Sequence, residues 1–221
     1  MIAVEQVEFA YSRRGPSVIH NISLELDPGE VTALVGPNGC GKTTLGKLMA
    51  GILKPSKGNV RVDGMDTRST ELSDLGRHVG YLFQEPERQL FASSVRDELS
   101  FVFDLMGQDR TAYTDRVDDM MVRFHLQHLA DDFPFQLSRG EKQRLAIATV
   151  MINNPAYYIF DEPTTGLDEV RRKELSEILS GLGANGTGML IISHDRLFVQ
   201  RHAQRVIRME GGKVIEDRKV T

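Results

Sequence analysis

The sequence is poor in several features that would each place it in a particular class of protein. It has a single cysteine, Cys40, so no disulfide can form within the chain and a reducing cytoplasm is expected. Its longest apolar runs, such as residues 189–192, are far shorter than the roughly 20 residues that cross a bilayer. The first residues include an early acid and no basic segment before an apolar one, so no signal peptide is expected.

Positive charge is also limited. The chain has 27 lysines and arginines against 31 aspartates and glutamates, a net charge of −4, and no basic stripe or tail. This balance argues against nucleic acid as the main partner. The acidic excess lies within residues 85–155, which hold 12 acidic and 8 basic side chains. Most of these charges are expected on a solvated helical surface.

Hydrophobic patterning predicts an α/β core interrupted by a helical insertion at about residues 85–155. We therefore expect a core made of residues 1–84 and 156–221. Alternating or β-branched runs predict strands at residues 2–11, 18–26, 30–36, 58–64, 78–84, 157–163, 188–195, 204–210 and 212–217. Apolar residues spaced by three and four predict helices at residues 42–51, 95–106, 115–129, 137–154, 169–182 and 196–203.

Residues 36–44, GPNGCGKTT, match the phosphate-loop pattern G-x-x-x-x-G-K-[ST]. The expected strand before it and helix after it argue against a chance glycine-rich turn. Lys42 should contact the β- and γ-phosphates, and the Thr43 hydroxyl should bind Mg²⁺. A bulky thiol reagent on Cys40 should block ATP binding. The expected ATP-binding residues of the loop are Gly36, Pro37, Asn38, Gly39, Cys40, Gly41, Lys42, Thr43 and Thr44.

Two carboxylates follow an apolar strand in YYIFDEP, residues 157–163. Asp161 is expected to hold the Mg²⁺ ion, as the acid after such a strand does in P-loop NTPases. Glu162 is then free to polarise an attacking water molecule. An isolated Asp-Glu pair would more simply be a surface turn, but here it accompanies a phosphate loop.

The segment LSRGEKQR, residues 137–144, has the S-x-x-E spacing of a capping box. Ser138 should accept from a backbone N–H of the first helical turn, and Glu141 should reach back to the N–H of Ser138. A helix should therefore begin here, and a helix N-terminus suits an anion.

These motifs, in this order, resemble those of the ATP-binding cassette (ABC) ATPases over essentially the whole chain. The resemblance implies a P-loop NTPase (RecA-like) α/β core with an antiparallel β subdomain and an inserted α-helical subdomain. It implies that Gln84, in YLFQ, contacts Mg²⁺ and orients water, that His194, in ISHD, is the switch histidine, and that Tyr11 stacks on adenine. Taken singly, each of these residues has a simpler explanation as a surface, structural or core side chain.

In that family, two cassettes dimerise head to tail with ATP between them. The resemblance implies that the helix start and the TGLD segment serve ATP on the partner, through Ser138, Arg139, Gly140, Glu141 and Asp168. The motif departs from LSGGQ at Arg139, which adds positive charge, and at Glu141, a conservative cap. Capping and phosphate binding compete for the Ser138 oxygen. With Glu162 as general base, a Glu162→Gln protein should be trapped as an ATP-bound dimer.

Residues 83–101, FQEPERQLFASSVRDELSF, resemble the corresponding run of energy-coupling-factor (ECF) cassettes. This implies an importer of a vitamin, cobalt or nickel at the cytoplasmic face of the cell membrane. The partners would be a second cassette, a transmembrane coupling protein with basic helices, and a membrane substrate-binding protein. Acidic contacts are expected from Glu85, Glu87, Asp97 and Glu98. Alternatively, four apolar residues of this run only pack the helices: Leu90, Phe91, Val95 and Phe101.

Other functions remain open. A conventional ABC importer with a soluble binding protein would share the same motifs. A soluble ABC ATPase of DNA repair or translation usually carries tandem cassettes or a coiled-coil insertion, and a small-molecule kinase would explain only the phosphate loop. Many ECF cassettes have a longer C-terminal extension than this chain, so dimerisation should depend on ATP and the membrane partner. Both a homodimer and a heterodimer fit the motifs.

Overall fold

The computed structural model describes residues 1–220, which form two compact units. The first unit contains Met1–Tyr81, Pro155–Glu162 and the segment from Lys173 onward. The second contains Leu82–Asn154 and Pro163–Arg172. The sequence placed the helical insertion at residues 85–155; in the structure, the stretch directly after Glu162 also packs with it.

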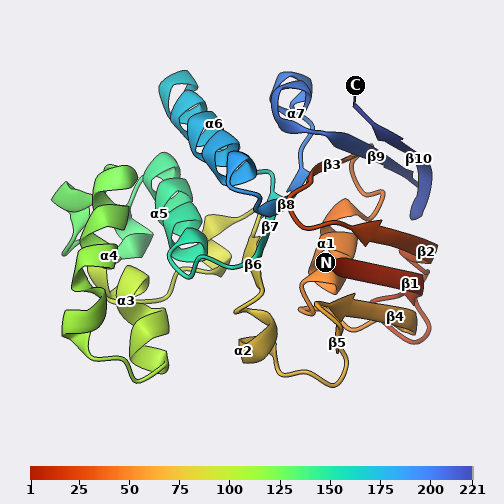
Figure 1. Cartoon of the computed structure of the whole chain (residues 1–221), viewed down its shortest axis with the longest axis horizontal. Coiled ribbons are helices and arrows are strands. Elements are labelled where there is room, and N and C mark those ends of the chain that lie inside the picture. The colour runs from red at the N-terminus through yellow and green to blue at the C-terminus, as the bar shows by residue number, and fades with distance from the viewer. Residues whose placement is uncertain (221) are drawn as a thin grey trace. The chain divides into compact units, whose positions relative to one another are not determined.

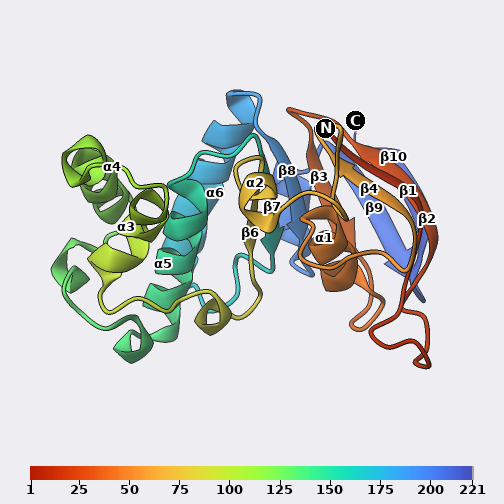
Figure 2. The same cartoon turned by 90° about the horizontal axis from the view of Figure 1, so that it is seen from below.

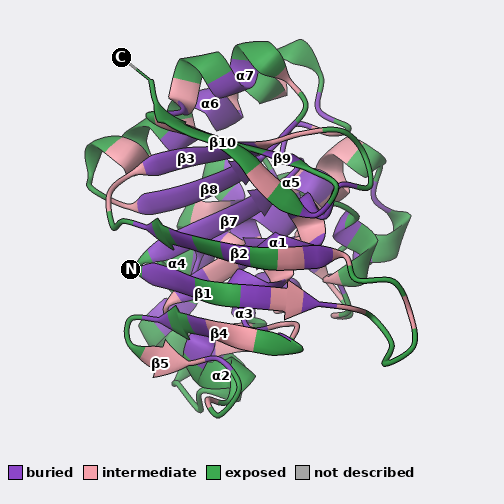
Figure 3. Ribbon diagram, turned by 90° about the vertical axis from the view of Figure 1, so that its right-hand side faces the viewer, coloured by how far each residue is buried: buried purple, intermediate pink, exposed green. Residues whose placement is uncertain are grey.

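A six-stranded sheet forms the centre of the first unit, in the order β10-β9-β3-β8-β7-β6. β3 is parallel to β8 and β9, and β7 is parallel to β8, whereas β10 runs antiparallel to β9. The central strands are near-continuous apolar runs because both faces are covered, and they are buried in Figure 3. The bounds are β3 Val31–Val35, β6 Val79–Leu82, β7 Tyr157–Asp161, β8 Gly188–Ile192, β9 Arg205–Glu210 and β10 Lys213–Lys219.

A second, smaller sheet of the same unit is antiparallel, in the order β2-β1-β4-β5. In β2, apolar residues alternate with exposed ones, because one face packs inward and the other meets water. Its strands are β1 Ile2–Phe9, β2 Ile19–Leu26, β4 Lys57–Val62 and β5 Met65–Asp66. The α/β class and the antiparallel β subdomain are thus confirmed.

Helix α1, Lys42–Met49, lies between the two sheets of the first unit and contacts β1 and β4 on one side and β7 and β8 on the other (Figure 1 and Figure 2). The chain leaves the helix near Gly51, whose φ of 72° suits glycine. The short helix α2, Leu72–Leu75, was not predicted. Helix α7 covers Arg196–His202, and α6, Glu169–Ala184, begins in the second unit and ends in the first.

The second unit is built from three helices: α3 Val95–Leu105, α4 Arg110–Arg123 and α5 Arg139–Met151. Each begins behind a side-chain cap, from Ser94, Asp109 and Ser138 respectively. α3 packs against both α4 and α5. Short 3₁₀ turns occupy Pro86–Arg88, Gln127–Leu129 and Pro134–Gln136.

The bounds predicted for the second of these helices, residues 115–129, are wrong. α4 begins earlier because the Asp109 carboxylate accepts the backbone N–H of Thr111 at 3.0 Å. It ends at Arg123 because His125 takes a left-handed φ of 53°, which a helix cannot continue. The apolar spacing beyond that point belongs to the Gln127–Leu129 turn.

Within residues 1–220, no helix combines the length and the apolar character that crossing a bilayer requires.

Candidate nucleotide-binding site

The phosphate loop leaves β3 at Val35 and enters α1 at Lys42, and its glycines are required by its shape. Gly36 has a φ of 151°, and a Cβ there would collide with the Met209 carbonyl oxygen. Gly41 has a φ of 102°, and its Cβ would lie 2.9 Å from Ile19 Cδ1. Only glycine tolerates both the angle and the space. The backbone can therefore curve tightly before the helix N-terminus, as a phosphate cradle requires.

The Lys42 side chain is folded into this loop. Its ammonium donates to the carbonyls of Gly36 at 2.9 Å and Pro37 at 3.0 Å, and the residue is only 8% exposed. A positive charge is thus held inside the curve of the backbone, where a polyphosphate would be received.

Cys40 lies in the same loop and is only 5% exposed. Its sulfur is 4.0 Å from the Lys42 ammonium. A bulky reagent can reach the thiol only when the loop opens, so labelling of the folded chain should be slow.

Asp161 ends β7 as a buried carboxylate with one oxygen available. The Tyr81 hydroxyl donates to Asp161 Oδ2 at 3.1 Å, while Asp161 Oδ1 makes no hydrogen bond within residues 1–220. Burial raises the pKa of this carboxyl, and hydrogen bonding by the Thr43 and Tyr81 hydroxyls opposes that rise. An orphaned carboxylate oxygen beside a threonine hydroxyl is the donor set that Mg²⁺ prefers.

No group of three or more His, Cys, Asp or Glu side chains in the described chain could by itself hold a metal ion. A cation at Asp161 would therefore need ligands of other kinds, such as the Thr43 hydroxyl, phosphate oxygens or water. This is the usual mode of Mg²⁺ binding at nucleotide sites.

Glu162 combines an unusual backbone with a well-placed side chain. Its φ is 53°, and its N–H donates to the Ile192 carbonyl at 2.8 Å. Glu162 Oε2 lies 2.9 Å from His194 Nδ1, with side-chain exposures of 10% and 73%. A left-handed conformation at a non-glycine residue costs energy and is concentrated at functional sites. The pairing brings together two residues that the sequence predicted as catalytic.

Tyr11 presents an exposed aromatic ring near the loop. The ring is 64% exposed and packs edge-on against Phe9, with centroids 5.0 Å apart. Its hydroxyl lies 2.9 Å from Thr44 Oγ1. The ring is thus anchored beside the phosphate loop; its stacking on adenine remains a prediction.

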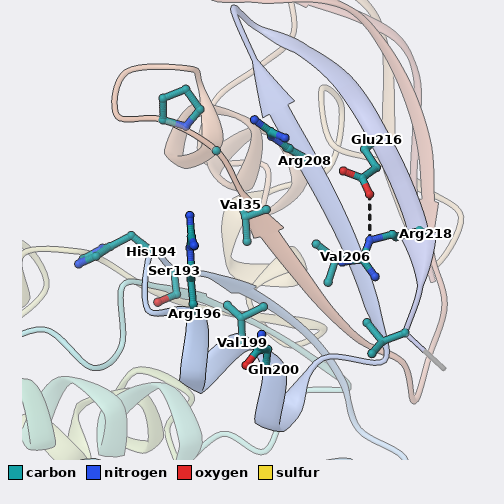
Figure 4. Close-up of a pocket in the computed structure, with 13 residues that line it drawn as sticks. Val35, Ser193, His194, Arg196, Val199, Gln200, Val206, Arg208, Glu216 and Arg218 are labelled. Atoms are coloured by element: carbon teal, nitrogen blue, oxygen red, sulfur yellow. Dashed lines mark ion pairs between the residues drawn. The ribbon is translucent and has the colours of Figure 1, made fainter.

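A basic pocket of about 700 Å³ adjoins Gly36, Pro37 and His194 (Figure 4). Arg196 and Arg208 line it, and their guanidinium groups make no hydrogen bond or ion pair within the described residues. The pocket's Glu216 and Arg218 form an ion pair at 2.9 Å. Uncompensated guanidinium groups raise the electrostatic potential around the loop and favour approach of an anion.

In the second unit, the capping box predicted at Ser138 is confirmed. Ser138 Oγ accepts the Glu141 N–H at 3.4 Å and donates to Glu141 Oε2 at 2.6 Å, and the Ser138 N–H donates to the same carboxylate at 2.8 Å. These bonds hold the pKa of the Glu141 carboxyl below its usual value. The Ser138 side chain is therefore occupied by its own helix.

Asp168 caps the next helix of the chain. Its Oδ1 accepts the Arg171 N–H at 2.8 Å, at the start of α6. Ser138 and Asp168 thus both cap the N-terminus of a helix. Their contacts to ATP on a partner, with those of Arg139, Gly140 and Glu141, remain predictions.

Gln84 also belongs to the second unit, and its predicted role remains a prediction. The sequence overlooked the residue that anchors its segment, Gln89. Gln89 Oε1 accepts the Phe83 N–H at 3.0 Å, and its amide donates to the Ala146 carbonyl at 3.0 Å. Gln89 lies in the segment that resembles ECF cassettes, but the resemblance assigned it no structural role. Tyr81, which contacts Asp161, was overlooked because its sequence context carries no signal.

One of the expected acidic docking contacts is wrong. Glu98 is 5% exposed, and its Oε2 accepts the backbone N–H groups of Phe91 at 2.8 Å and Ala92 at 2.7 Å. It therefore fastens the preceding loop to α3 and does not face a partner.

The three other acids are partly engaged within the chain. Glu85 pairs with Arg88 at 2.7 Å, Glu87 lies 3.8 Å from Lys142, and Asp97 accepts from Ser93 at 2.7 Å.

The apolar residues of the same segment divide into two kinds. Leu90 and Val95 are buried in the second unit, as the packing alternative expected. Phe91 is 57% exposed and Phe101 42% exposed, and their rings meet edge to face with centroids 4.5 Å apart. Packing of the helical unit alone does not account for an exposed aromatic pair.

Comparison with known proteins now defines the family. The family model described as ABC transporter matches residues 19–165. A putative ABC transporter ATP-binding protein of Pyrococcus furiosus is 42% identical over 97% of this chain and 82% of its own length. The energy-coupling factor transporter ATP-binding protein EcfA1 of Halalkalibacterium halodurans is 36% identical over 98% of this chain and 78% of its own length. Some relatives are longer: the chain spans only 37% of one from Caldanaerobacter subterraneus.

Solved structures agree. The cbiO1 protein of Clostridium perfringens, described as part of the ABC transporter complex cbiONQ, has a TM-score of 0.81 and 34% identity over 99% of this chain and 88% of its own. The ATP-binding cassette MJ0796, a dimer bound to ADP and phosphate, has a TM-score of 0.89 over 100% of this chain and 99% of its own. Its identity of 24% supports the fold alone. The chain belongs to the ABC transporter family, as an ATP-binding and ATP-hydrolysing cassette.

Proposed function

We propose that this chain powers an ECF-type importer for a vitamin, cobalt or nickel. The observation that carries the proposal is the segment at residues 83–101, whose sequence resembles ECF cassettes and whose Phe91 and Phe101 form an exposed pair. The similarity to EcfA1 and to cbiO1, a component of cbiONQ, supports the same assignment. The imported compound is set by the membrane partners, because the cassette does not contact it.

Nucleotide binding follows from the loop geometry. Backbone N–H groups of the loop at residues 38–44 surround the phosphates, with Lys42 supplying a positive charge to the β- and γ-phosphates. The exposed ring of Tyr11 stacks on the adenine base, held in place by its contact with Thr44. The arginine-lined pocket beside His194 increases the rate at which the anionic nucleotide arrives.

Thr43 and Asp161 fit a magnesium ion, since Asp161 offers a buried oxygen with no other hydrogen bond in the described chain. Gln84 completes this set in the proposal. When bound, the ion neutralises charge that develops on the phosphate oxygens during transfer to water.

Glu162 acts as the general base for the attacking water. His194 Nδ1 lies 2.9 Å from the carboxylate, and the exposed imidazole is available to the γ-phosphate. The strained backbone at Glu162 fixes where the carboxylate leaves the strand. Hydrolysis requires little more than this positioning and charge neutralisation.

A second cassette, either another copy of this chain or a close paralogue, closes the site. Ser138 and the N–H of Gly140 lie at a helix N-terminus, which attracts the γ-phosphate of ATP bound to the partner. Asp168 and the neighbouring Arg139 and Glu141 contribute to the same surface. ATP then joins the two cassettes, and hydrolysis separates them at the cytoplasmic face of the membrane.

The transmembrane partners would be a coupling protein with basic helices and a small membrane protein that binds the substrate. Phe91 and Phe101 supply apolar contacts for a coupling helix, with Glu85, Glu87 and Asp97 as acidic neighbours. Acids that are only weakly paired within the chain can exchange partners at low cost.

Affinity capture of this chain from native membranes in mild detergent tests the proposal. We expect a transmembrane protein with basic cytoplasmic helices together with a small, hydrophobic substrate-binding membrane protein. Capture of two permease subunits and a soluble binding protein would reassign the chain to a conventional ABC importer. Capture of no membrane protein at all would remove transport and leave the ATPase chemistry in place.

A further inference from the structure

The chain changes from the first unit to the second directly after Glu162. Pro155–Glu162 belong to the first unit, and Pro163–Arg172 to the second. The proposed base is thus the last residue of one unit, and the loop that continues from it is packed in the other. Whatever holds that loop also restrains the backbone of Glu162 through a single peptide bond.

A buried hydrogen bond ties this loop to α5. Gln143 is 1% exposed, and its Nε2 donates to the Pro163 carbonyl at 3.1 Å. The loop and the helix lie in the same unit. Because both groups are buried, losing the donor would leave the Pro163 carbonyl without a partner, which costs more than the bond itself contributes.

Close packing makes a second attachment. A Cβ built on Gly166 would lie 3.1 Å from Arg139 Cγ and 3.3 Å from Cδ, so the arginine stem lies directly over this glycine. Gly166 has a φ of 80°, which also requires glycine. At the next residue of the helix, a Cβ on Gly140 would lie 3.3 Å from the Gly166 carbonyl oxygen. The first turn of α5 and the loop are therefore in direct contact.

The Arg139 guanidinium makes no hydrogen bond or ion pair within residues 1–220, and the side chain is exposed. The contact that the structure gives Arg139 is made by its aliphatic stem, as is common for long basic side chains. Arg139, which stands where LSGGQ has glycine, therefore packs on the loop, in addition to adding the positive charge noted from the sequence.

We propose that Gln143 and Arg139 are positioning residues for Glu162. They fasten the loop at residues 163–168 to the helix start that carries Ser138, so that engagement of Ser138 by ATP on the partner also fixes the backbone next to the base. The proposal rests on the roles proposed for Glu162 and Ser138. It is independent of the transported compound and of the membrane partners.

Hydrogen exchange on the nucleotide-free full chain tests the attachment itself. Gln143→Met keeps the length of the side chain and removes the amide donor, and we expect amide exchange in residues 164–168 to accelerate about tenfold. Arg116→Met is a matched control. The Arg116 guanidinium donates to the Ile152 carbonyl at the end of α5, at 2.7 Å, and the substitution removes this hydrogen bond. Unchanged protection of residues 164–168 in Gln143→Met would overturn the proposal.

Variants of Arg139 separate the effect of packing from the effect of charge. This test remains available if Gln143→Met fails to fold. Arg139→Gly should accelerate exchange of the loop, whereas Arg139→Met, which keeps the stem, should behave as the native chain. Arg110→Gly controls for helix propensity, because Arg110 is likewise the first residue of a capped helix. A Met variant as mobile as the Gly variant would assign the role to charge and refute the packing argument.

Steady-state ATP hydrolysis tests the positioning. For Gln143→Met we expect kcat to fall about tenfold with KM within twofold, because Gln143 bonds the Pro163 carbonyl and the phosphate loop that binds ATP is untouched. Faster loop exchange with an unchanged kcat would contradict the positioning role. Failure to capture membrane partners would count against the importer proposal and would leave these measurements unaffected.

Discussion

Both the backbone and the side chain of Glu162 are held in place by neighbouring residues. Its backbone adopts a left-handed φ of 53°, its N–H is fixed by the Ile192 carbonyl, and its carboxylate meets His194. A strained backbone persists only where surrounding contacts determine it, and here they come from β8 and the turn that follows it.

Glu162→Gln should abolish hydrolysis and preserve ATP binding. The amide keeps the size of the side chain but cannot accept a proton, so we expect the rate to fall by about 10³. The uncleaved ATP should then hold two chains together, measured as a doubling of mass by light scattering in ATP and Mg²⁺. Glu177→Gln, an exposed carboxylate of α6, is the control and should hydrolyse ATP normally. A Glu162→Gln chain that stays monomeric would contradict the dimer model.

Cys40 provides a chemical probe of the phosphate loop, because it is the only cysteine. Its 5% exposure predicts that 5,5′-dithiobis(2-nitrobenzoic acid) reacts with the folded chain at least tenfold more slowly than with the chain unfolded in urea. Bound ATP should slow the reaction further, and the modified chain should not bind ATP. The thiolate absorbance released over time gives both rates. Full ATPase activity after verified modification would refute the prediction.

Single residues of the site could be predicted where their motif is local. The glycines of the phosphate loop, Lys42 and the Asp161–Glu162 pair could be recognised because their spacing is local. Tyr81 and Gln89 could not, since their contacts are made with residues far along the chain: Tyr81 with Asp161, and Gln89 with α5. A common residue type in an ordinary strand or turn carries no mark of such a partner.

At the scale of elements, the start of α5 shows two uses competing for one hydroxyl. The Ser138 side chain is engaged with Glu141 in both directions, yet the proposed function needs the same oxygen for a phosphate. A phosphate oxygen accepting from Ser138 would replace the Glu141 carboxylate, which can still accept the Ser138 N–H.

Variants of Ser138 can separate these uses. Ser138→Ala should lower the free energy of unfolding by about 1 kcal/mol, because it removes the cap. Ser138→Asp should restore the cap and the stability, but its charge would repel a triphosphate. Urea unfolding reports the first property, and ATP-dependent dimerisation in the Glu162→Gln background reports the second. An Asp variant that dimerises like the native chain would show that phosphate does not approach Ser138.

The contact between α6 and α7 predicts a pH effect on stability. His202 Nε2 lies 2.7 Å from Ser176 Oγ, and burial, aided by Arg201, lowers the pKa of the imidazole. Since the folded pKa is below the unfolded value of 6.5, stability is fully present above about pH 6.5 and is lost as pH falls through the folded pKa. His202→Gln should therefore reduce the drop in Tm between pH 7.5 and pH 5.5. An equal drop in both chains would refute this.

Helices and strands could be predicted where caps and apolar runs within the same segment define them. Ser138 and Glu141 gave the start of α5, and the apolar runs gave the central strands. The shifted bounds of α4 show the limit, because the apolar spacing continues past Arg123 while the backbone turns at His125. A left-handed φ at a residue other than glycine cannot be recognised from the sequence.

On the scale of the whole molecule, the two units expose different chemistry. The first holds the phosphate loop, Asp161, Glu162 and His194, and the second holds Ser138, Asp168 and the exposed phenylalanine side chains. The sequence placed the start of the helical insertion near residue 85, but it assigned the Pro163–Arg172 segment to the core. In the structure this segment belongs to the second unit, where Gln143 bonds the Pro163 carbonyl, a contact between residues 20 apart that no spacing rule reveals.

The exposed aromatic pair of the second unit leads to a prediction about the complete transporter. Phe91→Ser with Phe101→Ser should leave ATP hydrolysis by the isolated chain within twofold of normal, because both rings lie at the surface and outside the nucleotide site. The same change should remove most of the membrane protein that is captured with the native chain, since aromatic anchors dominate the energy of an interface.

Phe133→Ser with Phe135→Ser is the matched control for that measurement. These rings are also exposed, at 43% and 46%, and also touch, with centroids 5.4 Å apart, but they lie outside the segment that resembles ECF cassettes. If Phe91 and Phe101 form the docking site, the control should retain its membrane partners while the first variant loses them. Equal loss would indicate a general effect of exposed aromatic residues, and retention by both would place docking elsewhere on the chain. Quantitative capture from membranes expressing each variant distinguishes these outcomes, because the amount of partner is measured against a cassette whose own ATPase activity is known.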